Sequence, residues 1–328
     1  MAVDSKSGNA QALWHVSPGL AQLRDAAVTS PGPDEALVKT LWSAISRGTE
    51  RLISQGRVPA SEYERMRAPL QEGAFPFPVK YGYCAVGTVE AGPADWIGRR
   101  VFALHPHQSR FVAPLPLLTP LPNGLDPRRA ALAANMETAL NALWDSGAGP
   151  GDRIAVIGGG LVGLLVSFLC ARLPGAEVHL IDVDESRRSL TQALGAQFSR
   201  PDTTFCADCD VVFHTSATAS GLETAIELAG LEARVVELSW YGAGAIAAPL
   251  GGGFHSKRLQ IVSSQVGQVS PSRRPRWTHG RRMAKALELL DDARLDQLIT
   301  HEFAFTDLPR LLPGFLNSSD GIAAVVRY

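Results

Sequence analysis

Short apolar runs separated by prolines and glycines fill the first part of the chain. Residues 35–42, 82–90 and 100–104 are runs of this kind. Runs of this length at close spacing are typical of antiparallel strands in a barrel-like body. Residues 114–127 hold five prolines. Because proline has no backbone donor, the pattern predicts a connector there.

After this connector the hydrophobic pattern becomes an alternation of strands and helices. Helical patterns cover residues 128–146, 161–173, 185–195 and 221–231. Strand patterns cover residues 152–157, 177–182, 209–214, 233–238 and 258–263. This alternation predicts an α/β fold with a parallel, doubly wound sheet. The chain closes with a helix at 281–292, an extended segment at 298–305, a helix at 308–317 and a strand at 323–328.

Composition narrows the class of protein. The chain has 328 residues, of which 45% are apolar and 19% charged, which is typical of a globular protein of about two domains. With 31 Lys and Arg against 32 Asp and Glu, it lacks the basic excess of a nucleic-acid or membrane-surface binder. A chain of this length does not depend on four cysteines for disulfides, and its polar N-terminus lacks an apolar signal segment. We therefore expect a cytoplasmic protein.

A glycine-rich turn stands between a predicted strand and a predicted helix, with the sequence Gly158-Gly-Gly160-Leu161-Val162-Gly163. In a dinucleotide fingerprint the first glycine allows a sharp turn, the second lets the backbone approach a pyrophosphate, and the third lets the helix pack on the strand. The first turn of the helix, here Leu161 and Val162, then faces the phosphates. The strand–turn–helix setting favours a dinucleotide site over a plain turn.

An acidic residue ends the next predicted strand, as the fingerprint requires. Asp182 lies 19 residues after Gly163 and can accept hydrogen bonds from ribose hydroxyls. Its charge would repel a 2′-phosphate, so we expect NAD(H) to be favoured over NADP(H). Arg187 and Arg188 follow closely and act against that preference.

The order of elements resembles the medium-chain dehydrogenase/reductase superfamily over nearly the whole chain. The stretches most similar to its bacteriochlorophyllide dehydrogenase-like branch are residues 43–52, 136–144 and 236–242. The resemblance implies a GroES-like β-barrel catalytic domain at 1–130, a Rossmann NAD-binding domain at 131–270, and a return to the catalytic domain at 271–328. It also implies a homodimer or homotetramer.

Zinc enzymes of this superfamily hold the metal with a cysteine, a Gly-His-Glu motif and a third ligand. The resemblance places Ser46 or Arg47 at the cysteine position and Tyr83 at the histidine position. The stretch after Ala103, where a structural zinc lobe would follow, contains no cysteine up to Val112. The resemblance therefore implies a member without zinc.

Without zinc, a side chain must polarise or protonate the substrate oxygen. The resemblance places Tyr83 at the catalytic centre, where it either donates a hydrogen bond or simply packs. In a strand, Tyr81 and Tyr83 share one face. His105 and His107 are two residues apart in an extended stretch, so they are candidates for a proton relay or an anion contact, or they belong to a polar turn. With Glu137, which stands where some members have a carboxylate near the metal, they leave an unconventional metal site open.

Residues 43–52, which we call the first motif because they include the cysteine position, align with the superfamily in two ways. In one, Arg47 contacts the cofactor pyrophosphate, and in the other Thr49 supplies the hydroxyl of a proton relay. From Leu238 to Leu287 the chain has eight Lys and Arg and no Asp or Glu. This segment indicates an anionic substrate, a dimer contact or a solvated face.

These observations lead to three hypotheses. The first is an NAD(H)-dependent oxidoreductase without zinc that interconverts an alcohol and a carbonyl of a small-molecule substrate. The second is an NAD(P)H-dependent reductase of quinones or enones, and the third a nucleotide-binding protein without catalysis. No nucleic-acid or membrane partner is expected.

Overall fold

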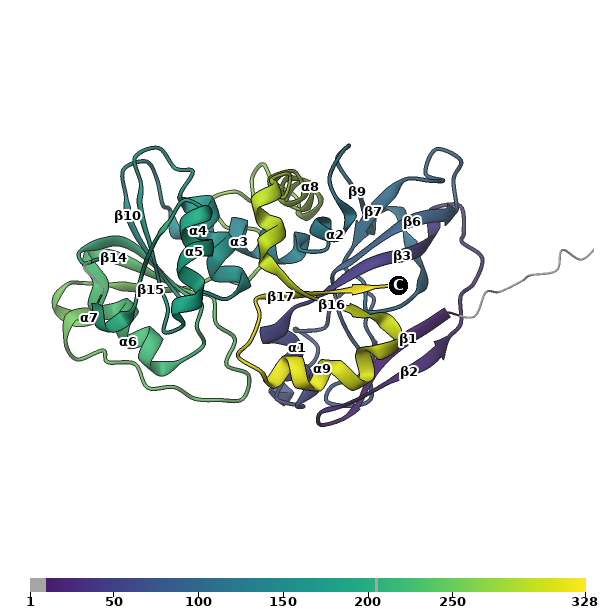
Figure 1. The fold of residues 1–328 in the computed structure, drawn as a ribbon, viewed down its shortest axis with the longest axis horizontal. Coiled ribbons are helices and arrows are strands. Elements are labelled where there is room, and N and C mark those ends of the chain that lie inside the picture. The colour runs from purple at the N-terminus through teal and green to yellow at the C-terminus, as the bar shows by residue number, and fades with distance from the viewer. Residues whose placement is uncertain (1–9, 204–205) are drawn as a thin grey trace, which may run out of the picture. The chain divides into compact units, whose positions relative to one another are not determined.

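A computed structural model describes residues 10–203 and 206–328 (Figure 1). The chain folds into two compact units. The first unit contains residues 1–134, 283–291 and 298–328, and the second contains 135–282 and 292–297. The second unit therefore extends beyond the predicted range of 131–270 on its C-terminal side.

The first unit is built on two sheets. The larger has seven strands in the order β16-β17-β3-β6-β7-β9, with β8 paired to β3, and the smaller has the order β2-β1-β5-β4. The strands are β1 Ala10–Ser17, β2 Leu20–Ala26, β3 Glu35–Ile45, β4 Glu72–Gly73, β5 Val79–Lys80, β6 Ala85–Ala91, β7 Arg100–Ala103, β8 Arg110–Pro114, β9 Leu118–Pro120, β16 Ile299–Ala304 and β17 Ala323–Arg327. The helices are α1 Arg47–Ser54, α2 Pro127–Ala130 and α9 Leu308–Asn317.

The second unit is a six-stranded parallel sheet in the order β12-β11-β10-β13-β14-β15. Its strands are β10 Arg153–Ile157, β11 Glu177–Ile181, β12 Gln197–Ser199, β13 Cys209–His214, β14 Ala229–Glu237 and β15 Gln260–Ser263. Its helices are α4 Leu161–Cys170, α5 Arg188–Ala193, α6 Ala219–Leu228 and α7 Gly253–Ser256. The strand order runs outward in both directions from β10 and β13, which is the doubly wound arrangement.

Two helices span the boundaries between the units, namely α3 Ala133–Ser146 and α8 His279–Leu289. Short 3₁₀ turns lie at Ala60–Glu62, Leu115–Leu117, Glu185–Arg187, Pro201–Thr203, Ala293–Leu298 and Phe305–Asp307. No helix within the described ranges is long and apolar enough to cross a membrane.

Burial explains why the central pattern is apolar almost throughout. The last four residues of β10 are buried, and nine of the ten residues of α4 are buried. Parallel strands covered on both faces carry near-continuous hydrophobic runs, in contrast to the alternating pattern of half-exposed strands. The glycine turn between β10 and α4 is therefore held by a rigid core.

Two local predictions were wrong, and one hairpin was missed. The predicted connector at 114–127 contains β9, which pairs with β7. The β1–β2 hairpin was not predicted, although it supplies an edge of the smaller sheet. Tyr81 and Tyr83 do not lie in a strand, because β5 ends at Lys80 and Gly82 has a φ of +126°.

Candidate functional site

The glycine turn has the backbone that a dinucleotide requires. Gly158 has a φ of +109°, which L side chains rarely adopt. A Cβ on Gly163 would lie 1.9 Å from the carbonyl oxygen of Gly158, so only glycine fits this helix against the strand. A Cβ on Gly160 would meet nothing within 4 Å. The middle glycine thus faces open space, where a pyrophosphate could approach the first turn of α4 at Leu161 and Val162.

Asp182 follows β11 directly and is fixed by the same turn. Its Oδ2 accepts a hydrogen bond from the Gly159 backbone N–H at 2.5 Å, and its Oδ1 accepts one from the Asp184 N–H at 2.7 Å. Each carboxylate oxygen keeps a further lone pair for a ribose hydroxyl. Arg187 pairs with Asp184 at 3.1 Å. These residues fit a dinucleotide whose ribose hydroxyls donate to Asp182.

A second cluster in this unit was missed by the sequence reasoning. His214 Nδ1 lies 2.7 Å from Glu237 Oε2, and Tyr241 donates to the same oxygen at 3.0 Å. The other imidazole nitrogen lies 2.8 Å from Ser216 Oγ. His214 is completely buried. The signal was present, because His214 is the last residue and Glu237 the next to last of two strands predicted for the parallel sheet.

In the first unit, Tyr83 meets the residues of the first motif. Its phenol is hydrogen-bonded by the side chains of Ser46 and Thr49. Burial raises the pKa of Tyr83 above its usual 10, and these two hydrogen bonds oppose that rise. Ser46 is the N-cap residue of α1, so the start of this helix places both hydroxyls against the phenol. The structure thus brings Tyr83 and Thr49 together, as the alignment with Thr49 in the relay position requires.

His107 belongs to a buried network beside this group. Its Nδ1 lies 2.7 Å from Ser43 Oγ and its Nε2 lies 3.2 Å from Glu50 Oε2. Ser43 Oγ also lies 3.0 Å from the hydroxyl of Tyr328. Glu50 is 1% exposed, and its other oxygen accepts the Ser46 N–H at 2.8 Å. Glu50 and Ser43 were not predicted as site residues, although both lie within the motif at 43–52.

His105 does not join His107. Its ring stacks on Phe111 with centroids 3.7 Å apart, and its Nδ1 lies 2.9 Å from the Pro106 carbonyl oxygen. Burial lowers the pKa of His105 to about 3. His15 is fully buried in the same unit and neither ring nitrogen has a hydrogen-bond partner; burial lowers its pKa to about 4. Both imidazoles are therefore neutral packing groups at physiological pH.

Arg47 contacts the C-terminal part of its own unit. It donates to the carbonyl oxygens of Asp320 and Gly321 at 3.1 and 3.2 Å. Its guanidinium also lies over the ring of Phe315, 5.4 Å from the centroid. These contacts tie Arg47 to the residues that precede β17.

Glu137 lies in the second unit and forms an ion pair with a buried arginine, Arg282. Arg282 Nε donates to its Oε1 at 2.9 Å, and both residues are less than 10% exposed. Arg282 also donates to Asn141 Oδ1 at 2.5 Å and to the carbonyl oxygens of Gln268 and Val266. The predicted basic segment is thus not uniform, because Arg282 serves a buried ion pair while Arg276 is exposed.

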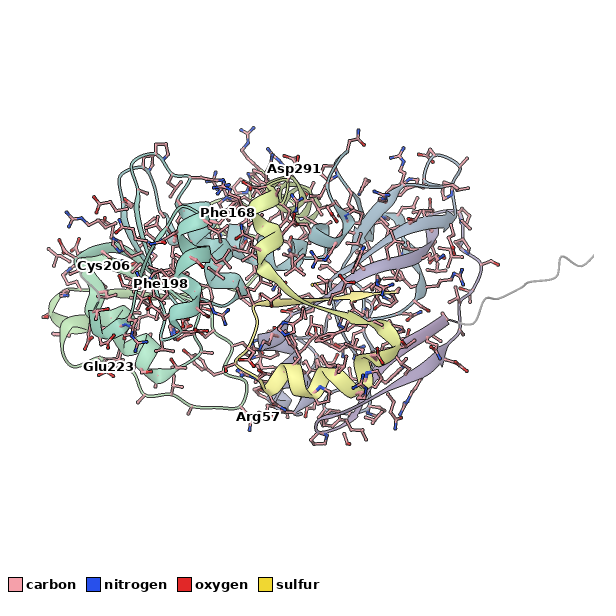
Figure 2. All side chains as sticks on the ribbon, viewed as in Figure 1. Arg57, Phe168, Phe198, Cys206, Glu223 and Asp291 are labelled. Atoms are coloured by element: carbon pink, nitrogen blue, oxygen red, sulfur yellow. The ribbon has the colours of Figure 1, made fainter. Side chains whose placement is uncertain are left out.

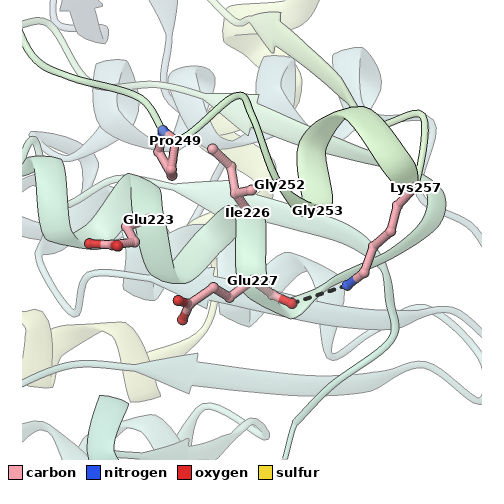
Figure 3. Close-up of a pocket in the computed structure, with 7 residues that line it drawn as sticks. All are labelled: Glu223, Ile226, Glu227, Pro249, Gly252, Gly253 and Lys257. Carbon is pink, nitrogen blue, oxygen red and sulfur yellow. Dashed lines mark hydrogen bonds between the residues drawn. The ribbon is translucent and has the colours of Figure 1, made fainter.

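One hollow on the second unit contains none of the predicted residues. It has a volume of about 340 Å³ and lies between α6 and the segment that leads into α7 (Figure 3). Glu223, Glu227 and Lys257 line it, and Lys257 donates to the Glu227 carbonyl oxygen. Glu223 is also labelled on the whole chain in Figure 2, together with Cys206, whose Sγ lies 3.0 Å from that of Cys209. None of the glycine turn residues lines this hollow.

Comparisons with known proteins agree with this architecture. A putative zinc-binding dehydrogenase of Sinorhizobium meliloti, solved with NADP bound, superposes with a TM-score of 0.79 at 19% identity and covers 98% of this chain and 100% of its own. The L-idonate 5-dehydrogenase of Escherichia coli gives a TM-score of 0.80 at 16% identity and covers 98% of both chains. The chain thus has the fold of these dehydrogenases. The predicted fold class and the resemblance to dehydrogenases of this fold are confirmed, whereas the predicted branch and the predicted absence of zinc stay predictions.

Sequence similarity to curated proteins is more limited. The 2-dehydro-3-deoxy-L-galactonate 5-dehydrogenase of Pseudoalteromonas atlantica is 28% identical over 174 residues, which are 50% of this chain and 50% of that protein. The chain thus spans about half the length of this relative. No protein-family model matches the chain.

The residues that the resemblance places at zinc-ligand positions can be compared with what a zinc ion requires. The resemblance places Ser46 or Arg47 at one ligand position and Tyr83 at another, and the Ser46 side chain is hydrogen-bonded to the Tyr83 phenol. Neutral hydroxyls are poor zinc ligands compared with thiolate and imidazole. The buried Cys84 is the nearest thiol in sequence. Over residues 10–203 and 206–328, no group of three or more His, Cys, Asp or Glu side chains could hold a metal ion.

Proposed function

We propose that this protein is a nicotinamide-dependent oxidoreductase that interconverts an alcohol and a carbonyl without catalytic zinc. The observation that carries the proposal is the glycine turn with its open middle glycine and its fixed acid, Asp182. The curated relative from Pseudoalteromonas atlantica is named as a dehydrogenase of a sugar acid, and another solved relative is named galactitol-1-phosphate dehydrogenase. Both names describe alcohol oxidation on polyhydroxylated substrates.

A nicotinamide cofactor held at the glycine turn and Asp182 would supply or accept the hydride. The residues of this chain then bind the cofactor and manage one proton at the substrate oxygen. Asp182 favours NAD(H), because its carboxylate accepts from ribose hydroxyls and repels a 2′-phosphate. Solved relatives are described with NADP and with NADH, so the preference rests on Asp182 itself.

Tyr83 is the proposed proton donor. Its raised pKa keeps the phenol protonated at neutral pH, so it can donate to a carbonyl oxygen that is being reduced. Ser46 and Thr49 hydrogen-bond to the phenol and stabilise the phenolate left after transfer. Behind them, Glu50 and His107 hold the start of α1 through the Ser46 N–H.

Replacing Tyr83 by Phe tests this assignment. We expect Tyr83→Phe to lower kcat for carbonyl reduction at least ~10-fold, or ~1.4 kcal/mol, while NADH affinity stays within twofold. Tyr81→Phe is the matched control, since Tyr81 is a neighbouring phenol whose ring contacts Tyr83 edge-on at 6.0 Å. An unchanged kcat in Tyr83→Phe would remove Tyr83 from the mechanism.

The same purified protein separates the alternative functions. Steady-state assays with NADH against aldehydes, ketones, quinones and enones should show carbonyl reduction. Reduction of enones or quinones alone would favour the double-bond reductase, and NADH binding without any turnover would favour a non-catalytic nucleotide-binding protein.

The substrate and assembly follow from the same proposal. A sugar acid or phosphorylated polyol is anionic, and exposed arginines such as Arg273 and Arg276 offer partners for it. We also propose a homodimer or homotetramer in the cytoplasm. Light scattering of the purified protein measures the oligomeric state.

A further inference from the structure

The His214–Glu237 pair lies at the carboxyl ends of two strands of the parallel sheet, the end at which the proposed cofactor site lies. In the parallel register Ile157 of β10 pairs with His214 of β13, and His214 pairs with Glu237 of β14. All three residues are the last of their strands, and the glycine turn begins directly after Ile157. The hydroxyl of Thr215 donates to the carbonyl oxygens of Ile157 and Gly158, which ties the end of β13 to the glycine turn.

The pair lies on the opposite side of the glycine turn from Asp182. In the sheet order, β11 with Asp182 is on one side of β10, whereas β13 and β14 are on the other. A dinucleotide bound across the carboxyl edge of such a sheet places its two halves on the two sides of the switch point. Because Asp182 takes the adenosine ribose, the nicotinamide half falls on the side of His214 and Glu237.

Glu237 is held as an anion at this edge. It accepts hydrogen bonds from His214 Nδ1, from the Tyr241 hydroxyl and from the Ser239 N–H at 2.7, 3.0 and 2.8 Å. Burial would raise the pKa of Glu237, but these donors outweigh it and the pKa is lowered. His214 Nε2 lies 2.8 Å from Ser216 Oγ, so both ring nitrogens have a hydrogen-bond partner and the imidazole is held against Glu237.

We propose that the Glu237 carboxylate, fixed by His214, Tyr241 and Ser239, gives the nicotinamide side of the crevice a permanent negative charge that favours the oxidised cofactor. The oxidised nicotinamide ring is cationic and the reduced ring is neutral. A fixed anion therefore stabilises NAD⁺ relative to NADH and sets the balance between oxidation and reduction. The inference rests on the proposed function, because it requires that the crevice bind NAD(H).

The test is a pair of binding titrations rather than an activity assay. NADH binding is followed by its fluorescence, and NAD⁺ binding by displacement of NADH. We expect Glu237→Gln to weaken NAD⁺ binding about tenfold and to leave NADH binding within about threefold, as for a unit charge at short range in a partly buried site. The matched control is Glu227→Gln, which removes the same charge from the far end of α6, where Glu227 is exposed.

A second variant keeps the inference testable if Glu237→Gln does not fold. Thr218 is the exposed N-cap of α6 next to this cluster, 3.0 Å from Ser216 Oγ, and aspartate is an equally good N-cap. Thr218→Asp adds a carboxylate at the same edge, and we expect it to tighten NAD⁺ binding relative to NADH by about threefold.

The binding results distinguish a failure of this inference from a failure of the proposed function. A ratio of NAD⁺ to NADH affinity that is the same in wild type, Glu237→Gln and Thr218→Asp would overturn the inference and leave the proposed function intact. A wild-type protein that binds neither form would overturn the proposed function and the inference with it. A drop in the ratio for Glu237→Gln but not for Glu227→Gln would support both.

Discussion

Removing the charge of Glu137 distinguishes a structural carboxylate from a catalytic one. The Arg282 guanidinium is 1% exposed and donates to Glu137, to Asn141 and to two backbone carbonyls. Glu137→Gln keeps the shape of the side chain and leaves that guanidinium without its counter-charge. Breaking a buried pair by removing one partner costs about 3–5 kcal/mol. We therefore expect the free energy of unfolding to fall by about that amount.

The assay is urea unfolding followed by tryptophan fluorescence, with kcat measured on the same samples. Glu288→Gln is the control, because Glu288 pairs with Lys285 on an exposed helix surface and such pairs contribute about 0–1 kcal/mol. The double variant Glu137→Met, Arg282→Met should recover at least ~2 kcal/mol of the summed single losses, since neither charge is then left alone. A stable Glu137→Gln protein with kcat reduced ~100-fold would refute the structural role and place Glu137 in the chemistry.

The remaining predictions concern the cofactor turn and acid stability. Gly163→Ala should lower the free energy of unfolding in urea by about 3 kcal/mol, because its Cβ meets a backbone oxygen at 1.9 Å. Gly160→Ala should leave the free energy of unfolding within ~1 kcal/mol and lower the affinity for NADH. Equal losses of stability in the two variants would contradict this. Asp182→Ser should raise NADPH affinity relative to NADH at least ~10-fold in fluorescence titrations, and an unchanged ratio would show that another residue sets the preference. Burial lowers the pKa of His15 from the usual 6.5 to about 4. Between these pH values the unfolded chain binds a proton at His15 that the native state does not. The contribution of neutral His15 to stability is therefore complete above pH 6.5, and about 3 kcal/mol is lost as the pH falls to 4. His15→Gln should flatten that acid slope in pH-dependent unfolding, and an unchanged slope would argue against a neutral buried His15.

The second unit was predictable from the sequence because its signals are local. The apolar run of β10, the glycines after it and Asp182 at the end of β11 each follow from neighbours a few residues apart. The strand order then follows from right-handed crossover connections. The short strand β12, only three residues long, carried too little pattern to be recognised.

The first unit was harder because its contacts are distant in sequence. The network around His107 joins residues that are 57, 64 and 285 positions apart in its three links. No local pattern shows that His105 stacks on Phe111 while His107, two residues later, meets a carboxylate. The resemblance to a family placed Tyr83 and Thr49 near each other, but the partners Ser43 and Glu50 required the structure.

The partner of Glu137 also lay outside the reach of the sequence. Glu137 and Arg282 are separated by 145 positions, and a segment rich in arginine looks exposed when only its composition is considered. The ion pair becomes visible only once α3 and α8 are placed together. Interior charges of this kind are not distinguished from surface charges by hydrophobic periodicity.

The central claim is that this fold carries out its chemistry without zinc, and metal analysis of active protein tests it most directly. Plasma emission on the purified enzyme, before and after dialysis against a chelator, is combined with NADH-dependent carbonyl reduction by the same samples. We expect far less than one zinc per chain and an unchanged rate of carbonyl reduction after dialysis. About one zinc per chain, lost together with activity and restored by adding zinc, would contradict it.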